Sequence, residues 1–285
     1  MSTVTTPPDR APTRTSTRRR RVPAALQLRR FPTVGPIAWF TLFFLYFPML
    51  IVVVYAFNAG NRALVWEGFS TRWFGVVIRD NNIIGATTVS LRLAVLAMAI
   101  STVMALGIAL TLDRFRRRGY SIAMGLIAAP LVIPEIVLAV ATLGFIRWIG
   151  LSPGFTSMLL AHITFCIPFA LLPMRARLRE LDPAYFEAAA DLGATHSQQF
   201  RRVTLPLMVP GIVSGALLAF IISMDDFIIS NFLSAAGSTT LPIYLFGLIR
   251  KGASPAVNSI ATLLLLLAVA IVLVTYLLTQ RRRTP

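Results

Sequence analysis

Three acidic side chains lie inside stretches of sequence that are otherwise apolar. Asp225 and Asp226 are adjacent in one stretch, and Glu135 follows Pro134 in another. If these stretches cross a membrane, each charge costs about 2.5–3.5 kcal/mol to insert, so such side chains normally face a cavity or a partner group. One interpretation is therefore an acidic pathway for an organic cation. The aromatic residues available for cation–π contacts with such a cation are Phe227, Phe232 and Tyr244.

A structural interpretation of the same acids is also open. Adjacent residues on a helix point about 100° apart, so only one carboxylate can face a pathway, and the other faces a neighbouring helix or the helix end. The acids could then be satisfied by helix hydroxyl groups or by Arg92 and Arg147. A further alternative is a proton relay through Glu135, Asp225 and Asp226, as in an ion-coupled transporter.

The other residues that commonly do chemistry are few and dispersed. His162 and His196 are too few for a metal site, and the single cysteine, Cys166, has no second cysteine to pair with. The sequence shows no metal-ligand cluster and no nucleophile–base pair. These observations disfavour an intramembrane enzyme.

The composition requires a membrane around most of the chain. Of the 285 residues, 56% are hydrophobic, and the mean hydropathy is +0.74, whereas soluble domains carry nearer half apolar and about a quarter charged residues. The length accommodates about six bilayer-crossing helices of about 20 residues each. We therefore predict an all-α integral membrane protein with six transmembrane helices. The predicted crossings are Ile37–Phe57, Gly85–Leu112, Ser121–Ile146, Phe155–Met174, Leu207–Leu233 and Val257–Leu278.

The positions of the basic residues indicate which connections lie on the cytoplasmic side of the membrane. The formal net charge of +16 would also suit a nucleic-acid-binding protein, but the arginines form runs at the chain ends and in alternate connections instead of a binding face. With both termini in the cytoplasm, 20 of the 27 basic residues lie on the inner side. This asymmetry predicts cytoplasmic ends and no nucleic-acid partner.

The connections divide the chain into four parts. Residues 1–31 are rich in Pro, Thr and Arg and lack a signal-peptide cleavage site, which predicts a disordered cytoplasmic tail. Residues 32–82 hold the first crossing and an outer amphipathic segment. Residues 83–280 form the core, with a cytoplasmic loop at 177–206, and residues 281–285 are a basic cytoplasmic end.

Two local features modify the crossings. Ser70-Thr71-Arg72-Trp73-Phe74, in the first outer connection, is typical of a short interfacial helix with aromatic anchoring. Prolines inside the crossings indicate either simple kinks or bends that form a cavity. These prolines are Pro48, Pro130, Pro134, Pro168 and Pro173.

The loop between the fourth and fifth predicted crossings has the punctuation of two short helices. Asp182-Pro183 supplies an N-cap and a helix-starting proline for a first helix over Ala184–Leu192, and Gly193 is suited to ending it. Thr195-His196-Ser197-Gln198 has the form of a capping box, which starts the second helix. Leu205-Pro206 then ends the loop at the next crossing.

The first loop helix has an uncommon face. Ala188-Ala189-Ala190 carries almost no side chain, so the backbone of a partner could approach closely. Glu187 and Asp191, at i and i+4, place two carboxylates on one side. From the residues alone, the loop is either a docking site for a partner protein or simply well capped.

The spacing of the loop resembles a known signature. Glu187-Ala188-Ala189-x-x-x-Gly193-x9-Val203-x-Leu205-Pro206 is similar to the cytoplasmic motif of permease subunits in binding-protein-dependent ABC importers, with valine in place of the customary isoleucine. The resemblance implies the MetI-like fold of type I importers, in which this loop forms coupling helices that sit in a cleft of a separate ATPase. The residues assigned to ATPase docking are Glu187, Ala188, Ala189, Asp191, Gly193, Leu205 and Pro206.

A narrower resemblance concerns the cargo. Ser223–Phe232, Thr240-Leu241-Pro242 and Gly252-Ala253-Ser254-Pro255 look like the second permease subunit of spermidine/putrescine importers. Met224 and Ser230 depart from that pattern, where leucine and threonine are expected. The resemblance implies a polyamine substrate, and relatives that import aminoalkylphosphonates, opines or γ-aminobutyrate share much of it. The predicted pathway residues are Asp225, Asp226, Glu135, Phe227 and Phe232.

The resemblance also implies an assembly. The chain has no Gly-rich phosphate loop of the Walker type, so ATP and Mg²⁺ would be bound by a partner, and no cofactor or enzyme activity is expected in this chain. The implied partners are a homologous second permease, an ATPase dimer, an extracytoplasmic substrate-binding protein and the lipid bilayer. The implied location is the cytoplasmic (inner) membrane of a bacterium. A proton-coupled transporter remains the alternative, and it leaves the loop signature unexplained.

Overall fold

The computed structural model describes residues 34–112, 117–252 and 254–281, so the predicted tail at 1–31 lies outside the described residues. Two compact units, Met1–Ile51 and Val52–Pro285, are considered separately. The first contains most of α1 (Val34–Ala56), whose residues from Gly35 to Ile51 are exposed on every side. A helix that is apolar all round needs lipid or another protein around it.

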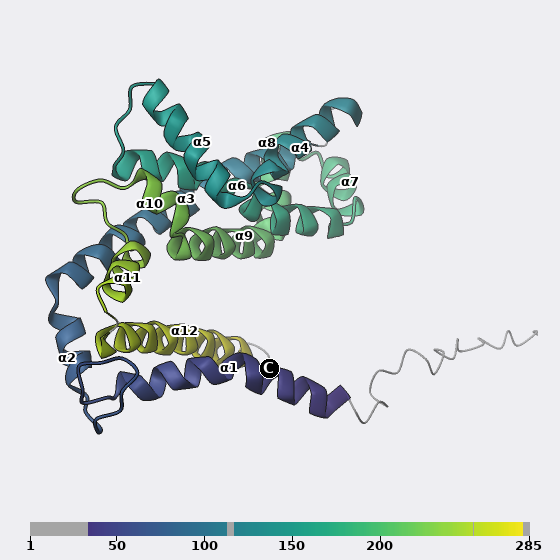
Figure 1. Ribbon diagram of the computed structural model, residues 1–285. Coiled ribbons are helices and arrows are strands. Elements are labelled where there is room, and N and C mark those ends of the chain that lie inside the picture. Colours follow the sequence, from purple (N-terminus) through teal and green to yellow (C-terminus); the bar gives the residue numbers. More distant parts are fainter. Residues whose placement is uncertain (1–33, 113–116, 253, 282–285) are drawn as a thin grey trace, which may run out of the picture. The chain divides into compact units, whose positions relative to one another are not determined.

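The named elements of the second unit are all helical, which confirms the predicted class for the described residues. Connections between them are short (Figure 1). In chain order the elements are α2 (Arg72–Arg79), α3 (Asn81–Thr111), α4 (Arg117–Val132), α5 (Glu135–Trp148), α6 (Phe155–Glu180), α7 (Ala184–Asp191), α8 (His196–Gln199), the π-helical turn η4 (Phe200–Thr204), α9 (Leu205–Asp225), α10 (Ile228–Leu233), α11 (Leu241–Arg250) and α12 (Pro255–Arg281).

The predicted number of six spans is not confirmed. Within the described residues, four helices are long and apolar enough to cross a membrane, namely Gly35–Ala56, Asn81–Thr111, Phe155–Glu180 and the continuous run His196–Asp225. Helices α4 and α5 pass the same test only as a pair, bent by 110° at the break between them, which gives up to five spans. Helix α12, which is 27 residues long, covers the sixth predicted stretch, Val257–Leu278.

Prolines act differently from one crossing to another. The third predicted crossing, Ser121–Ile146, is broken at Pro134, which has φ −53° and ψ 131° and ends the helical run before Glu135. Proline has no N–H to donate and restricts the residue before it, so a break is expected there. By contrast, α6 runs through Pro168 and Pro173 and continues beyond the predicted end at Met174 as far as Glu180.

The centre of the second unit is a bundle of α3, α6 and α9, which pack on one another (Figure 1). Gly211, Gly215, Ala219 and Ser223 of α9 are buried at intervals of four residues, so they share one face. A Cβ atom on Gly215 would lie 2.4 Å from the carbonyl oxygen of Ala170 in α6. Small residues thus allow the two backbones to approach closely, as is common between membrane helices.

Two hydrogen bonds link further elements of the second unit. The N–H of Leu241, at the start of α11, donates to Ser90 Oγ of α3 at 2.8 Å. Ser259 Oγ of α12 donates to the carbonyl of Ala56 at 3.1 Å. The short helix predicted around Ser70–Phe74 is present as α2, which begins at Arg72, and the Arg72 guanidinium lies 4.8 Å from the centre of the Trp73 ring.

The close approach of α6 and α9 gives a stability prediction. Gly215→Ala should destabilise the fold by about 1–3 kcal/mol, because overpacking forces the backbones apart, and this outweighs the gain of about 1 kcal/mol in helix propensity. Gly107→Ala is the matched control, since its Cβ would meet nothing within 4 Å. Thermal unfolding of the detergent-purified protein measures both. Equal melting temperatures for the two variants would contradict the assigned packing.

Candidate functional site

The fifth predicted crossing is broken at the acid pair. Helix α9 ends at Asp225, Asp226 has φ −63° and ψ 122°, and α10 begins at Ile228. The prediction of one continuous crossing over Leu207–Leu233 is therefore wrong, because the chain leaves the helical conformation between the two acids. The two side chains are therefore not held about 100° apart, as adjacent residues on one continuous helix would be.

The carboxylate of Asp226 caps the second half of this broken helix. Its Oδ1 accepts from the N–H of Ile229 at 3.3 Å, and its Oδ2 accepts from the N–H of Ser230 at 2.8 Å. The first amides of a helix have no carbonyl partner within the helix, so a carboxylate there stabilises the helix start. Asp226 thus faces a helix end, which is one of the two orientations considered from the sequence.

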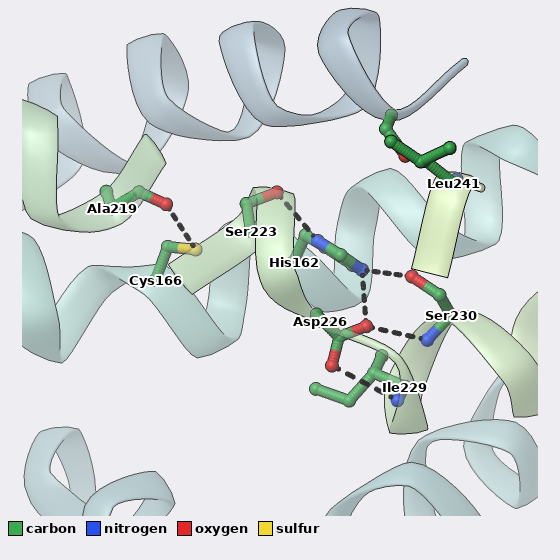
Figure 2. Close-up of polar contacts among 9 residues, drawn as sticks. His162, Cys166, Ala219, Ser223, Asp226, Ile229, Ser230 and Leu241 are labelled. Carbon is green, nitrogen blue, oxygen red and sulfur yellow. Dashed lines mark hydrogen bonds and ion pairs between the residues drawn. The ribbon is translucent and has the colours of Figure 1, made fainter. Parts of the chain in front are cut away.

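A buried histidine holds the same carboxylate from α6 (Figure 2). His162 Nε2 lies 3.2 Å from Asp226 Oδ2 and 3.1 Å from Ser230 Oγ, and its Nδ1 lies 2.8 Å from Ser223 Oγ. The side chains of His162 and Asp226 are each only 1% exposed. The ring therefore joins α6, α9 and α10 through one polar cluster.

Sequence reasoning missed this role for His162, which it considered only as a metal ligand. The available signal was its position inside a predicted crossing, where a titratable side chain needs a partner. Of the partners considered for the acids, Arg92 and Arg147 do not pair with Asp226, because within the described residues its contacts are with His162, Glu135 and the start of α10.

The three intramembrane acids meet at one cavity. A pocket of about 530 Å³ lies beside the break, and Glu135, Asp225, Asp226 and Phe227 all line it. Glu135 reaches it because the bend before α5 places the first residue of that helix there, next to the carboxyl group of Asp226. The other lining residues are Phe165, Phe169, Ile221, Ile222 and Ile228.

The two adjacent aspartates have different surroundings. Asp226 is buried and fully engaged, whereas Asp225 is exposed and its carboxylate makes no hydrogen bond or ion pair with any described residue. Like charges around one pocket repel one another unless a cation or a proton lies among them. Asp225 is therefore the carboxylate of this pocket that no described residue neutralises. No group of three potential metal ligands occurs in the described part of the chain.

Only part of the predicted aromatic set lines the pocket. Phe232 packs instead against the apolar cluster around Leu93 and Met158, and Tyr244 packs in a separate cluster on the α11 side. Phe165 and Phe169, which the sequence did not single out, supply the missing ring faces, with their centroids 5.3 Å apart.

The loop at residues 177–206 has the predicted capping bonds. Asp182 Oδ1 accepts from the N–H of Ala184 at 2.9 Å, and Gly193 ends α7 with φ +77°, a conformation suited to glycine. The Thr195–Gln198 capping box is present, with reciprocal bonds of 2.9 and 3.3 Å. The second loop helix differs from expectation, because α8 continues through η4 into α9 without a break.

The loop combines an exposed face with a firm attachment. Glu187, Ala188 and Asp191 are exposed, and Leu192 is 88% exposed. On the other side, Phe186 packs against the core cluster that contains Met174 and Met208. Gln199 Nε2 donates to the carbonyl of Phe186 at 2.8 Å, which ties α8 to α7. Of the other motif residues, Ala189 and Leu205 are half-buried, and Gly193 and Pro206 are exposed.

Comparison with known proteins finds a family and named relatives. Residues 101–284 match the family described as binding-protein-dependent transport system inner membrane component. The chain is 37% identical, over 84% of its length and 93% of the relative, to the spermidine/putrescine transport system permease protein PotC of Haemophilus influenzae. It is 42% identical, over 78% of its length and 82% of the relative, to the putrescine transport system permease protein PotI of Escherichia coli.

Solved structures with the same fold include two ABC transporters. One is a bacterial transporter involved in the import of the acidic polysaccharide alginate, with a TM-score of 0.67 and 20% identity, over 89% of this chain and 94% of that chain. The other is the MetNI methionine transporter, with a TM-score of 0.57 and 21% identity, over 76% of this chain and 100% of that chain. The family match and these relatives together show that the chain belongs to the binding-protein-dependent transport system inner membrane components, the permease subunits of ABC importers.

Proposed function

We propose that this chain is a pore-forming subunit of an ATP-driven importer and that it passes a polyamine across the cytoplasmic membrane. The observation that carries the proposal is the convergence of Asp225, Asp226 and Glu135 on one aromatic-lined pocket at a helix break. The identity to permeases named for spermidine and putrescine supports the same substrate class.

The chemistry of the pocket suits a polyamine better than the other solutes considered. Ammonium groups separated by short apolar chains are stabilised by carboxylates and by ring faces. Asp225 offers an uncommitted carboxylate, and Phe165 and Phe227 offer rings beside it. Aminoalkylphosphonates, opines and γ-aminobutyrate each carry an anionic group as well, and a pocket with three acids repels that group.

Energy comes from a partner in this proposal. The exposed face of α7, at Glu187 and Ala188, docks in an ATPase subunit, and ATP-driven closure of two such subunits moves the loop. Because α8 continues directly into α9, movement of the loop is transmitted to Asp225 at the other end of that helix. A homologous second permease completes the pathway, a binding protein delivers the substrate outside, and both chain ends lie in the cytoplasm.

A proton-coupled transporter is the second candidate, and the geometry favours it less. Its acids would have to form a relay along the membrane normal. Glu135, Asp225 and Asp226 instead surround one pocket, and Asp226 is already engaged by His162 and the start of α10.

The substrate proposal is tested with the whole complex in proteoliposomes. Putrescine or spermidine, supplied with the binding protein, should raise ATP hydrolysis several-fold and drive uptake that stops without ATP. γ-Aminobutyrate and 2-aminoethylphosphonate serve as the comparison solutes. Equal stimulation by these solutes would exclude a polyamine-selective importer, and uptake driven by a proton gradient alone would support the second candidate.

The docking proposal is tested by a matched pair of charge reversals. Glu187→Lys should lower co-purification of the ATPase about tenfold, because it places a like charge against a basic partner surface. Glu180→Lys is the control, since its carboxylate is 67% exposed at the end of α6 and outside the loop helices. The proposal fails if Glu187→Lys retains the ATPase as the unaltered chain does, or if both variants lose it equally.

The two aspartates should respond differently to neutralisation. Asp225→Asn should reduce uptake of a polyamine about tenfold, equivalent to about 1.4 kcal/mol, and leave the melting temperature unchanged. Asp226→Asn should lower stability by about 1–3 kcal/mol, because it weakens a buried charged network. Uptake per folded molecule and thermal unfolding measure the two effects. Asp225→Glu keeps the charge and should restore uptake; full uptake by Asp225→Asn would refute the role of this carboxylate.

A further inference from the structure

Two arginines at the end of α6 converge on one tyrosine of α4. The guanidinium groups of Arg175 and Arg179 both donate to the phenolic oxygen of Tyr120, at 3.5 Å for Arg179. The Arg175 guanidinium also lies 5.3 Å from the centre of the Tyr120 ring and donates to the sulfur of Met124 at 3.1 Å. All of these acceptors are neutral.

Neither arginine has a counter-ion within the described residues. The ion pairs found there join His162 to Asp226 and Arg177 to Glu180. Arg175 is nevertheless half-buried, and Arg179 follows it by one helical turn, so two like charges face the same phenol. Guanidinium groups at such spacing are suited to an anion with several oxygens, above all a phosphate, which they bind in a bidentate manner.

The depth of the cluster points to the membrane surface. Arg175 lies about 20 residues after the start of α6 at Phe155, which at 1.5 Å per residue is about 30 Å, the thickness of the hydrocarbon core. Tyrosine is enriched at that boundary. Exposed apolar side chains flank the cluster, including Ile122 and Leu126 of α4. A phosphate that continues into acyl chains fits these surroundings better than a free anion.

We propose that Arg175 and Arg179, held in place by Tyr120, bind the phosphate of an anionic phospholipid in the cytoplasmic leaflet. This leaflet assignment rests on the orientation given in the proposed function. Bound lipid would neutralise the two guanidinium groups and pin the start of α4 to the end of α6. That end leads directly into the docking loop through Leu181, so lipid would also steady the base of the loop.

The test measures lipid binding by the purified complex, without ATP or polyamine, so its outcome is independent of transport. Titration with dioleoyl phosphatidylglycerol should raise the melting temperature and leave lipid bound in native mass spectra, and dioleoyl phosphatidylcholine should not. Arg175→Gln and Arg179→Gln should each weaken retention about fivefold. Arg179 is exposed, so its variant reports on the site even if the other one folds poorly.

The matched control is Arg250→Gln, because that guanidinium also lies over an aromatic ring, 5.5 Å from the centre of Phe246, but on α11. It should retain the lipid. Unchanged retention in both test variants would overturn the proposal. So would an equal stabilisation by inorganic phosphate, which indicates a free-anion site, or a loss of ATPase co-purification without loss of lipid, which indicates a protein partner.

Discussion

The structure depends on how closely the backbones of α6 and α9 approach each other. In lipid, apolar surface gives little driving force for helix association, so helices adhere through close van der Waals contact between small residues. Gly215 leaves no room for even one methyl group against the carbonyl of Ala170. The same contact brings Ser223 opposite His162, and the polar cluster at the helix break exists because the two helices meet at this distance.

The break in the fifth crossing separates two tasks that adjacent acids would otherwise share. Asp226 gives its carboxylate to the start of α10 and to a buried ring, so it maintains the broken geometry. That geometry leaves Asp225 at the last position of α9, free at the pocket. Discontinuous helices are a common way to place unpaired groups at a substrate site within a membrane.

The loop at residues 177–206 is attached to this arrangement at both of its ends. Helix α6 continues to Glu180, and α8 continues through a π-helical turn into α9. Both helices that enclose the polar cluster therefore extend to the ends of the loop segment at residues 181–195. The π-helical turn at Phe200–Thr204 joins α8 to α9, and such turns frequently occur at functional positions. The loop is thus continuous with the pair of helices that carries His162 and Asp225.

Local chemistry made much of this protein predictable from its sequence. The caps at Asp182, Gly193 and Thr195 depend on residues within four positions of one another, so the first loop helix and the start of the second could be predicted nearly to the residue. The helical class and most of the crossings follow from long apolar runs, which have only one way to satisfy their backbone groups in lipid. The acids could be recognised as costly in a membrane, so a role could be expected for them. The loop motif from Glu187 to Pro206 indicated the family.

Only the tertiary structure decided which acid does what. The partners of Asp226 include His162, which is 64 positions away, and no local pattern connects them. The bends at Pro134 and Asp226 likewise determine that Glu135 shares a pocket with Asp225 while Phe232 does not. The sequence by itself determined the helices, the loop caps and the presence of buried charge, because these depend on short-range periodicity. The pairing of those charges depended on contacts between distant helices, which short-range periodicity does not encode.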